Sequence, residues 1–237
     1  MAPTSTTHLN VFTRPGSVTY TLPSPPYSSQ YTTITLPVGS KWTSGLHWHE
    51  THTEYLQILS GAALITLNNT TQIYTSSSGT ITVPRYAKHE WQRASRALAL
   101  GYDFTPLSSS LTQSLLDDEE LIVREWTDPN DGQKEVFFRN LSGIIADDVE
   151  RGEGEWVLTP KLWKLFREVD NWPVFFEMWR VPVLGKVLER MSLGRVVEWG
   201  VTHGVLGLVC LGGWVLGMKG VREEYTPKKE EIVSRER

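Results

Sequence analysis

Three histidines and one glutamate in the N-terminal half of the chain have the residue types and spacing that bind a metal ion. His47 and His49 alternate with Trp48, so both imidazoles point to one face of an extended strand. Glu54 follows a short turn and can bring a carboxylate to the same point. His89 follows a proline turn. Three neutral imidazoles and one carboxylate suit a divalent first-row transition metal, with coordination positions left for substrate, oxygen or water.

Short runs of β-branched and aromatic residues, separated by Gly, Ser and Asn, surround these four residues. Such regular spacing is typical of an antiparallel sandwich or barrel, so the fold is predicted to be mainly β. Asn68-Asn69 lies between two of the runs and predicts a hairpin. The predicted strands are 31–38, 54–59, 62–67, 72–74, 80–83 and 97–104.

The composition changes along the chain and divides it into five segments. The first is rich in Pro, Thr and Ser, which favours turns and extended structure. The apolar residues of 111–121 are spaced as in a helix, and residues 128–132 predict a strong turn. The chain after this turn is rich in tryptophan. The predicted segments are an extended lead-in (1–30), a β-barrel (31–106), a helical extension (107–200), an apolar helix (201–218) and a charged tail (219–237).

The apolar segment 201–218 contains no Asp, Glu, Lys or Arg and is long enough for a transmembrane helix. The first twenty residues lack the apolar stretch of a secretory signal. We therefore expect a single-pass, tail-anchored protein with its barrel in the cytosol, most simply at the endoplasmic reticulum. The alternative is a soluble cytoplasmic protein in which this segment is buried against the barrel.

Charge and cysteine content narrow the classes of ligand. There are 23 Lys and Arg against 27 Asp and Glu, a net charge of −4, which argues against a broad nucleic-acid-binding face. Cys210 is the one cysteine, so the chain forms no intramolecular disulfide and no thiolate-based zinc site. Any metal must be held by histidine and carboxylate.

The stretch from His47 to Gly61 resembles the first motif of the cupin superfamily, G-x5-H-x-H-x3–4-E-x6-G, from its first histidine onward. The glycine that leads this motif is absent at its usual spacing. The second cupin motif, G-x5-P-x-G-x2-H-x3-N, is matched at Gly79, Pro84 and His89, with one residue fewer after the glycine. It departs at Tyr86, where the family has glycine, and at Arg93, where it has asparagine.

The resemblance implies a single cupin jelly-roll barrel whose metal ligands are His47, His49, Glu54 and His89. Glu54 would also act as a general base, and the metal would be Fe, Mn, Ni, Cu or Zn. The layout of one barrel, tryptophan-rich helices and an apolar helix is similar to the short cupin-domain oxidoreductases of fungal secondary-metabolite pathways. The resemblance also implies a homodimer formed through sheet edges.

That similarity implies a metal-dependent oxidoreductase, of oxygenase or oxidase type, acting on a small oxygen-bearing metabolite that is polyketide-like or aromatic. A redox-neutral isomerase, cyclase or dehydratase is the competing enzyme class. A non-catalytic cupin that binds a small molecule is a third reading. Oxygen consumption separates the first two, and retained metal argues against the third.

The sequence leaves the roles of several other residues undecided. His52 lies in the turn between the predicted ligands and could replace a ligand, shuttle a proton or simply lie at the surface. His8 and His203 lie far from the motifs and are not ligand candidates. Four aromatic residues could line a ligand cavity or fill the core: Trp42, Trp48, Tyr86 and Trp91.

Overall fold

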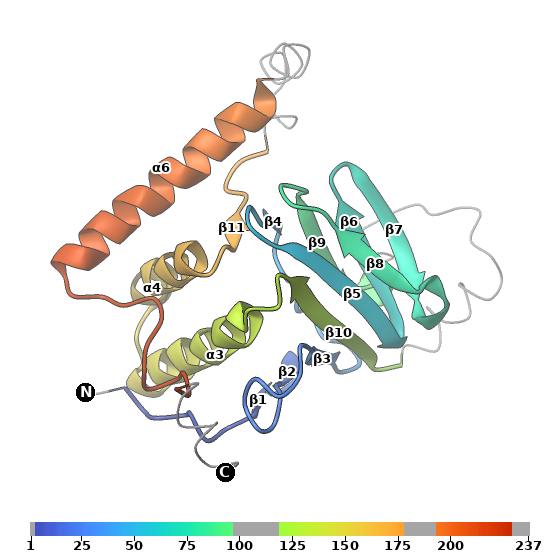
Figure 1. The fold of residues 1–237 in the computed structure, drawn as a ribbon, viewed down its shortest axis with the longest axis horizontal. Helices are drawn as coiled ribbons and strands as arrows, with labels where there is room; N and C mark the ends of the chain where they lie inside the picture. The colour runs from blue at the N-terminus through green and yellow to red at the C-terminus, as the bar shows by residue number, and fades with distance from the viewer. Residues whose placement is uncertain (1–2, 97–118, 178–192, 229–237) are drawn as a thin grey trace.

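A computed structural model describes residues 3–96, 119–177 and 193–228 (Figure 1). The predicted strand 97–104 and most of the predicted helix 111–121 lie outside these residues. The strands are β1 (Val11–Arg14), β2 (Val18–Thr21), β3 (Thr32–Leu36), β4 (His47–Trp48), β5 (Thr53–Ser60), β6 (Ala62–Leu67), β7 (Thr70–Thr75), β8 (Thr80–Val83), β9 (His89–Arg93), β10 (Leu121–Asp128) and β11 (Trp172–Pro173), with a 3-10 turn at Ser76–Ser78.

These strands form two antiparallel sheets, as the predicted barrel requires. The six-stranded sheet has the order β1-β2-β3-β10-β5-β8, and the five-stranded sheet has the order β11-β4-β9-β6-β7. Burial alternates along β5 and β10, so every second side chain faces the space between the sheets. The apolar core fills this space and includes Ile34, Leu36, Leu56, Ile58, Ile65, Val83, Trp91, Leu121 and Val123.

The sheets extend beyond the barrel boundaries predicted from the sequence. The predicted lead-in, 1–30, contains β1 and β2, because the short runs between its prolines pair with β3 as a meander. The predicted helical extension, 107–200, contains β10, which lies between β3 and β5 in the six-stranded sheet. It also contains β11, which pairs with β4. The barrel therefore draws strands from much more of the chain than 31–106.

The hairpin predicted at Asn68-Asn69 is confirmed. Leu67 pairs with Thr70 across the turn, and β6 and β7 run antiparallel from there. Asn68 has φ +53, a left-handed conformation that asparagine tolerates better than most residues.

Three helices pack on one side of the sheets: α3 (Gln133–Arg151), α4 (Glu155–Glu168) and α6 (Gly194–Val215). Figure 1 shows α3 nearest to β10 and α6 farthest from it. The turn predicted at 128–132 joins β10 to α3. A second apolar cluster fills the space between the helices, formed by Ile144, Leu165, Val169 and Tyr225.

α6 begins and ends earlier than the predicted apolar helix, and its N-terminal half is held against the barrel. Lys88 Nζ lies 2.9 Å from Glu198 Oε2. The His203 ring stacks between Trp172 and Trp199, with ring centroids 4.0 and 3.9 Å apart. Glu198, Thr202 and His203 on α6 therefore face the protein.

The outward face of α6 is apolar. Its most apolar window has a mean hydropathy of 1.4 and is only 22% buried, and by length and composition alone α6 could cross a membrane. No other helix among residues 3–96, 119–177 and 193–228 meets that test. The exposed apolar side chains of α6 include Val196, Val201, Leu208, Leu211, Trp214 and Val215.

The chain returns to the helical layer after α6. Tyr225 is fully buried, and its hydroxyl donates to Asp147 Oδ2 on α3 at 2.7 Å. The backbone N–H of Thr6 donates to Glu224 O at 2.9 Å. The first part of the predicted charged tail is thus packed against α3, α4 and the N-terminal segment, so both ends of α6 are attached to the same body.

Candidate metal centre

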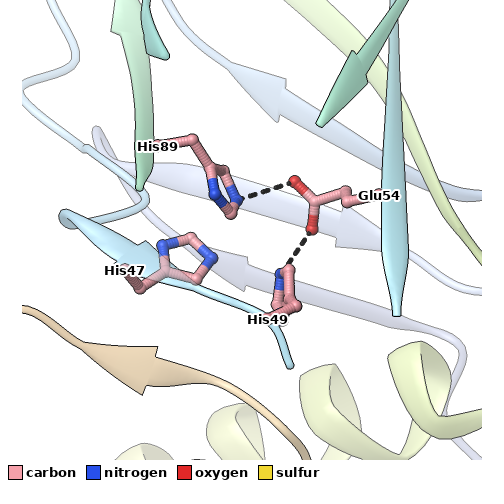
Figure 2. Close-up of side chains that lie close together, drawn as sticks. All are labelled: His47, His49, Glu54 and His89. Atoms are coloured by element: carbon pink, nitrogen blue, oxygen red, sulfur yellow. Dashed lines mark hydrogen bonds and ion pairs between the residues drawn. The ribbon is translucent and has the colours of Figure 1, made fainter. Parts of the chain in front are cut away.

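The four predicted ligands lie together between the two sheets (Figure 2). β4 and β9 pair with His47 opposite His89, which places these two rings 4.1 Å apart. Glu54 reaches them from the facing sheet, because it points inward from β5. One ligand atom from each of the four residues lies within 4.8 Å of the others, and all four side chains are buried. The sequence thus identified a real cluster.

The backbone fixes which nitrogen of each imidazole carries a proton. The Nδ1 atoms of His47, His49 and His89 lie 2.7, 2.6 and 3.1 Å from the carbonyl oxygens of Gly45, Asp170 and Ala87. Because a carbonyl oxygen only accepts hydrogen bonds, each Nδ1 must donate one. Each Nε2 is then left to face the centre of the cluster, which is how histidine ligands are commonly oriented by their outer contacts.

The contacts around Glu54 fit a bound cation. His49 Nε2 lies 3.0 Å from Glu54 Oε2, although a neutral imidazole with its proton on Nδ1 and an ionised carboxylate offer only lone pairs to each other. His89 Nε2 lies 3.2 Å from Glu54 Oε1 and, among the described residues, has no hydrogen-bond partner. A metal ion accepts all of these lone pairs, so the donor set fits a divalent transition metal.

The protonation of the cluster also fits metal binding. Burial lowers the pKa of His47 well below its usual value, with further lowering by His89 and His49. Burial likewise lowers the pKa of His49. Burial opposes ionisation of Glu54, but Lys134 and then His89 outweigh it and hold the pKa of this carboxyl well below its usual range. His47 and His49 are therefore neutral and Glu54 is ionised, the forms that bind metal.

Two further charged residues beside Glu54 were not identified from the sequence. Lys134 Nζ, at the start of α3, donates short hydrogen bonds to Glu54 and to Glu125. Burial, followed by the charge of Glu54, raises the pKa of Glu125 to about 7. Burial would lower the pKa of Lys134, but Glu125 and Glu54 raise it above its ordinary value. Lys134 is thus a buried cation shared by two carboxylates.

Asp170 organises the turn between the predicted ligands. Its carboxylate accepts the backbone N–H groups of Glu50, Thr51 and His52 at 2.9 to 3.1 Å, while its backbone oxygen orients His49. The pKa of this carboxyl is held below its ordinary value: burial opposes the shift, but hydrogen bonds, first that of the His52 side chain, outweigh it. Asp170 itself has φ +54, just after α4.

His52 belongs to this support rather than to the ligand set. Its side chain is 5% exposed, so its interpretation as a surface histidine is wrong. Nδ1 lies 2.9 Å from Asp170 Oδ2, and Nε2 lies 3.2 Å from Asp131 Oδ2. These two contacts join the ligand turn to the segment after α4 and to the segment before α3.

Tyr86, one of the departures from the cupin motifs, lies in a turn beside the ligand cluster. Tyr86, which replaces a glycine of the second motif, adopts φ +63, and its backbone N–H donates to His49 O at 2.6 Å. The turn therefore keeps a left-handed residue, at a cost of about 1–2 kcal/mol for a non-glycine side chain. Gly61 of the first motif is needed sterically, since a Cβ there would lie 2.9 Å from Glu120 O.

A cavity of about 290 Å³ opens onto the cluster at His47 and Glu54. Glu125 and Lys134 line it beside Glu54. The rest of its wall is largely aromatic and aliphatic and includes Tyr20, Trp42, Trp91, Phe137, Phe138, Leu141 and Phe166. This size and composition suit a small apolar molecule with few polar groups.

The predicted aromatic residues divide between cavity and core. Trp42 lines the cavity, and Trp91 both lines it and packs in the core at 1% exposure. Trp48 is buried and donates to Glu50 Oε1, whereas Tyr86 is 56% exposed. Among the described residues, His8 and His203 lie outside the ligand cluster, as expected.

Comparisons with known proteins identify only distant likenesses. No protein-family model matches the sequence, and no curated protein matches it. Among solved structures, an RmlC-like cupin from Shewanella frigidimarina is 10% identical, covering 49% of this chain and 81% of its own, with a TM-score of 0.31. A cupin 2 domain-containing protein from Halorhodospira halophila is 15% identical, covering 47% and 62%, with a TM-score of 0.30.

The capsular polysaccharide assembling protein CapF from Staphylococcus aureus is 16% identical, with 52% of this chain covered and a TM-score of 0.33. This chain spans about a third of that protein's length, 32%. The chain's own architecture agrees with the cupin resemblance of its sequence: two facing antiparallel sheets have the predicted His, His, Glu and His side chains gathered between them.

Proposed function

We propose that this chain is a metal-dependent enzyme that acts on a small, oxygen-bearing metabolite of aromatic or polyketide-like character. One observation supports this proposal most strongly. The Nε2 atoms of three histidines and the ionised carboxylate of Glu54 converge on one point, and no proton is available to bridge His49 and Glu54. A largely apolar cavity adjoins that point. A binding protein without a metal has no need of this donor set.

The proposed reaction is an oxidation, of oxygenase or oxidase type. His47, His49, Glu54 and His89 would hold Fe, Mn, Ni, Cu or Zn, which would polarise a substrate oxygen as a Lewis acid and, if redox-active, support chemistry with oxygen. The aromatic wall of the cavity would orient a planar substrate and exclude water.

Proton transfer in this site is better assigned to Glu125 than to Glu54. Both oxygens of Glu54 are already engaged, one near His89 and the other near His49 and Lys134. Glu125 lines the cavity and shares Lys134 with Glu54. Glu125 can hold a substrate proton while Lys134 stays charged beside it. This pair also supports the competing redox-neutral reaction, an isomerisation, cyclisation or dehydration.

Oxygen uptake tests the reaction class. Purified full-length protein loaded separately with Fe(II), Mn(II), Ni(II), Cu(II) or Zn(II) is given a panel of phenolic and enolic compounds in an oxygen-electrode cell. We expect consumption of oxygen with a redox-active metal and none with Zn(II). Turnover of a compound without oxygen consumption would replace the oxidative proposal by the redox-neutral one. Equal turnover by metal-free protein would overturn both.

We also propose that α6 attaches the enzyme to a membrane. Its apolar outward face runs about 33 Å, at 1.5 Å per residue over 22 residues. A spanning, tail-anchored helix would require residues 219–228 to leave α3 and α4 and cross to the other side, which would expose the buried Tyr225. These contacts favour a helix that lies in the membrane surface with its outward face in lipid.

Vesicle flotation tests this arrangement. Wild type is expected to float with phosphatidylcholine–phosphatidylserine vesicles and to be released by alkaline carbonate, as a surface helix would be. The double substitution Leu208→Lys and Leu211→Lys, at positions that are 73% and 61% exposed, should weaken vesicle binding by at least about tenfold. Val149→Lys, at a 73% exposed position on α3, is the matched control.

Retention after carbonate would favour the spanning topology. Absence of wild-type flotation would favour the soluble cytoplasmic alternative. A homodimer, implied by the cupin resemblance, stays a prediction.

A further inference from the structure

The cavity beside the candidate metal centre has a second polar end, formed by Arg14 and Tyr20. Both residues line the cavity, Arg14 from β1 and Tyr20 from β2. In the order of the sheet, three strand steps separate β2 from β5, which carries Glu54. At about 4.8 Å per step, this is roughly 14 Å of sheet. The two polar groups therefore lie on different strands of the wall of one cavity.

The hydroxyl of Tyr20 has a hydrogen to donate. Its oxygen accepts from Arg14 Nη2 at 2.6 Å and from Trp42 Nε1 at 3.1 Å, which uses both lone pairs. Among the described residues, no acceptor lies in hydrogen-bond geometry for the hydroxyl's own hydrogen. Tyr20 is 1% exposed, so bulk water is not the acceptor.

Arg14 supplies positive charge at the same end. Within the described part of the chain it forms no ion pair, and its guanidinium carbon lies 5.5 Å from the centre of the Tyr20 ring. The two carboxylates that line the cavity, Glu54 and Glu125, are both paired with Lys134. A guanidinium and a buried hydroxyl that both donate are the groups that recognise a carboxylate.

We propose that Arg14 and Tyr20 bind a carboxylate of the ligand, and that the ligand is therefore an aromatic or conjugated acid. Its apolar body would lie along Trp42 and Phe138, and its other end would reach Glu54. The placement of the second end of the ligand at the metal centre rests on the proposed function. The carboxylate site itself depends only on Arg14, Tyr20 and Trp42.

Calorimetric titration of the full-length protein tests the proposal. The probes are benzoate, cinnamate and 4-hydroxycinnamate, each compared with its neutral amide. We expect wild type to bind at least one acid about tenfold or more tightly than its amide, since a hydrogen bond to a charged group contributes about 1.5–3 kcal/mol. Arg14→Met should remove this preference, and Arg14→Lys should keep part of it.

Two controls separate a site-specific effect from a general one. Arg124→Met removes an arginine from an exposed position on β10 that does not line the cavity, and it should leave the preference unchanged. Tyr20→Phe should weaken acid binding with little effect on the amides. If Arg14→Met does not fold, as judged by circular dichroism, Arg14→Lys and Tyr20→Phe carry the test.

Each titration is repeated after chelation of metal. The acid preference should persist in chelated protein, because Arg14 and Tyr20 do not contact the four ligands. Failure of the metal assignment with a retained preference would leave this proposal standing. Equal binding of acids and amides, binding of none of the acids, or an unchanged preference in Arg14→Met would overturn it.

Discussion

Replacing His49 by alanine is expected to abolish stoichiometric metal binding. The variant loses one of four ligand atoms that lie within 4.8 Å of one another, and it leaves Glu54 without its contact to the imidazole. Changes to the outer contacts of a metal site already cost about tenfold to a hundredfold in affinity, so loss of a ligand should cost more than about a hundredfold.

Elemental analysis and metal-dependent thermal shift measure this loss. Wild type should hold about one metal ion per chain and melt at a higher temperature when metal is added, because a ligand that binds only the folded state stabilises it. The His49→Ala variant should show neither property. His8→Ala, which removes an exposed histidine outside the cluster, should behave like wild type. One metal per chain retained in His49→Ala would refute the assignment.

The largest effect on stability is expected from Lys134→Met. Lys134 is 11% exposed, and Glu54 and Glu125 are 1% and 6% exposed. Removing the shared cation leaves two buried carboxylates side by side, and removing one partner of a buried ion pair costs about 3–5 kcal/mol. Urea denaturation should show this decrease in the free energy of unfolding of the metal-free protein.

The chain offers a matched comparison for this variant. Lys161 also bridges two carboxylates, those of Asp148 and Glu153, but Glu153 is 28% exposed, so only one of the two carboxylates is fully buried. Lys161→Met should therefore cost much less. Adding Glu125→Gln to Lys134→Met should recover part of the loss, because only one buried carboxylate then lacks a cation. Equal losses for the two lysine variants, or no recovery, would show that charge burial is not the cause.

The ligand set could be predicted from the sequence because its signals are local. His47, His49 and Glu54 lie within one strand, one turn and the start of the next strand, and the alternation of a strand decides which way each points. The core strands from 54 to 83 were recognisable for the same reason. Their apolar residues alternate, and short turns separate them.

The remaining strands lack that local signal. β10 carries Arg124, Glu125 and Asp128 among its apolar residues, so it does not look like a central strand. Glu125 nevertheless faces inward, because Lys134 from the next element compensates its charge. β1 and β2 are short strands in a proline-rich segment. The pairing of β1 with β2 and of β2 with β3, rather than their own composition, makes them strands.

The residues that orient the ligands could not be predicted from the sequence, because they come from distant parts of the chain. Asp170 follows α4, and nothing in the surrounding sequence distinguishes its carboxylate from a solvated one. Its role arises only when α4 and β11 bring it beside the turn at Glu50, Thr51 and His52. The role of His52 could not be decided from the sequence for the same reason, since both of its carboxylate partners are far away in sequence.

The contact between His49 and Asp170 joins residues 121 positions apart, and this separation bears on how the protein matures in the cell. While the ligand-bearing strands β4, β5 and β9 emerge from the ribosome, the carbonyl oxygen that orients His49 has not yet been synthesised. Neither has α3, with the lysine that holds Glu54 ionised. We therefore expect the nascent barrel to be a poor acceptor of metal and the released, fully folded chain to be the form that acquires it.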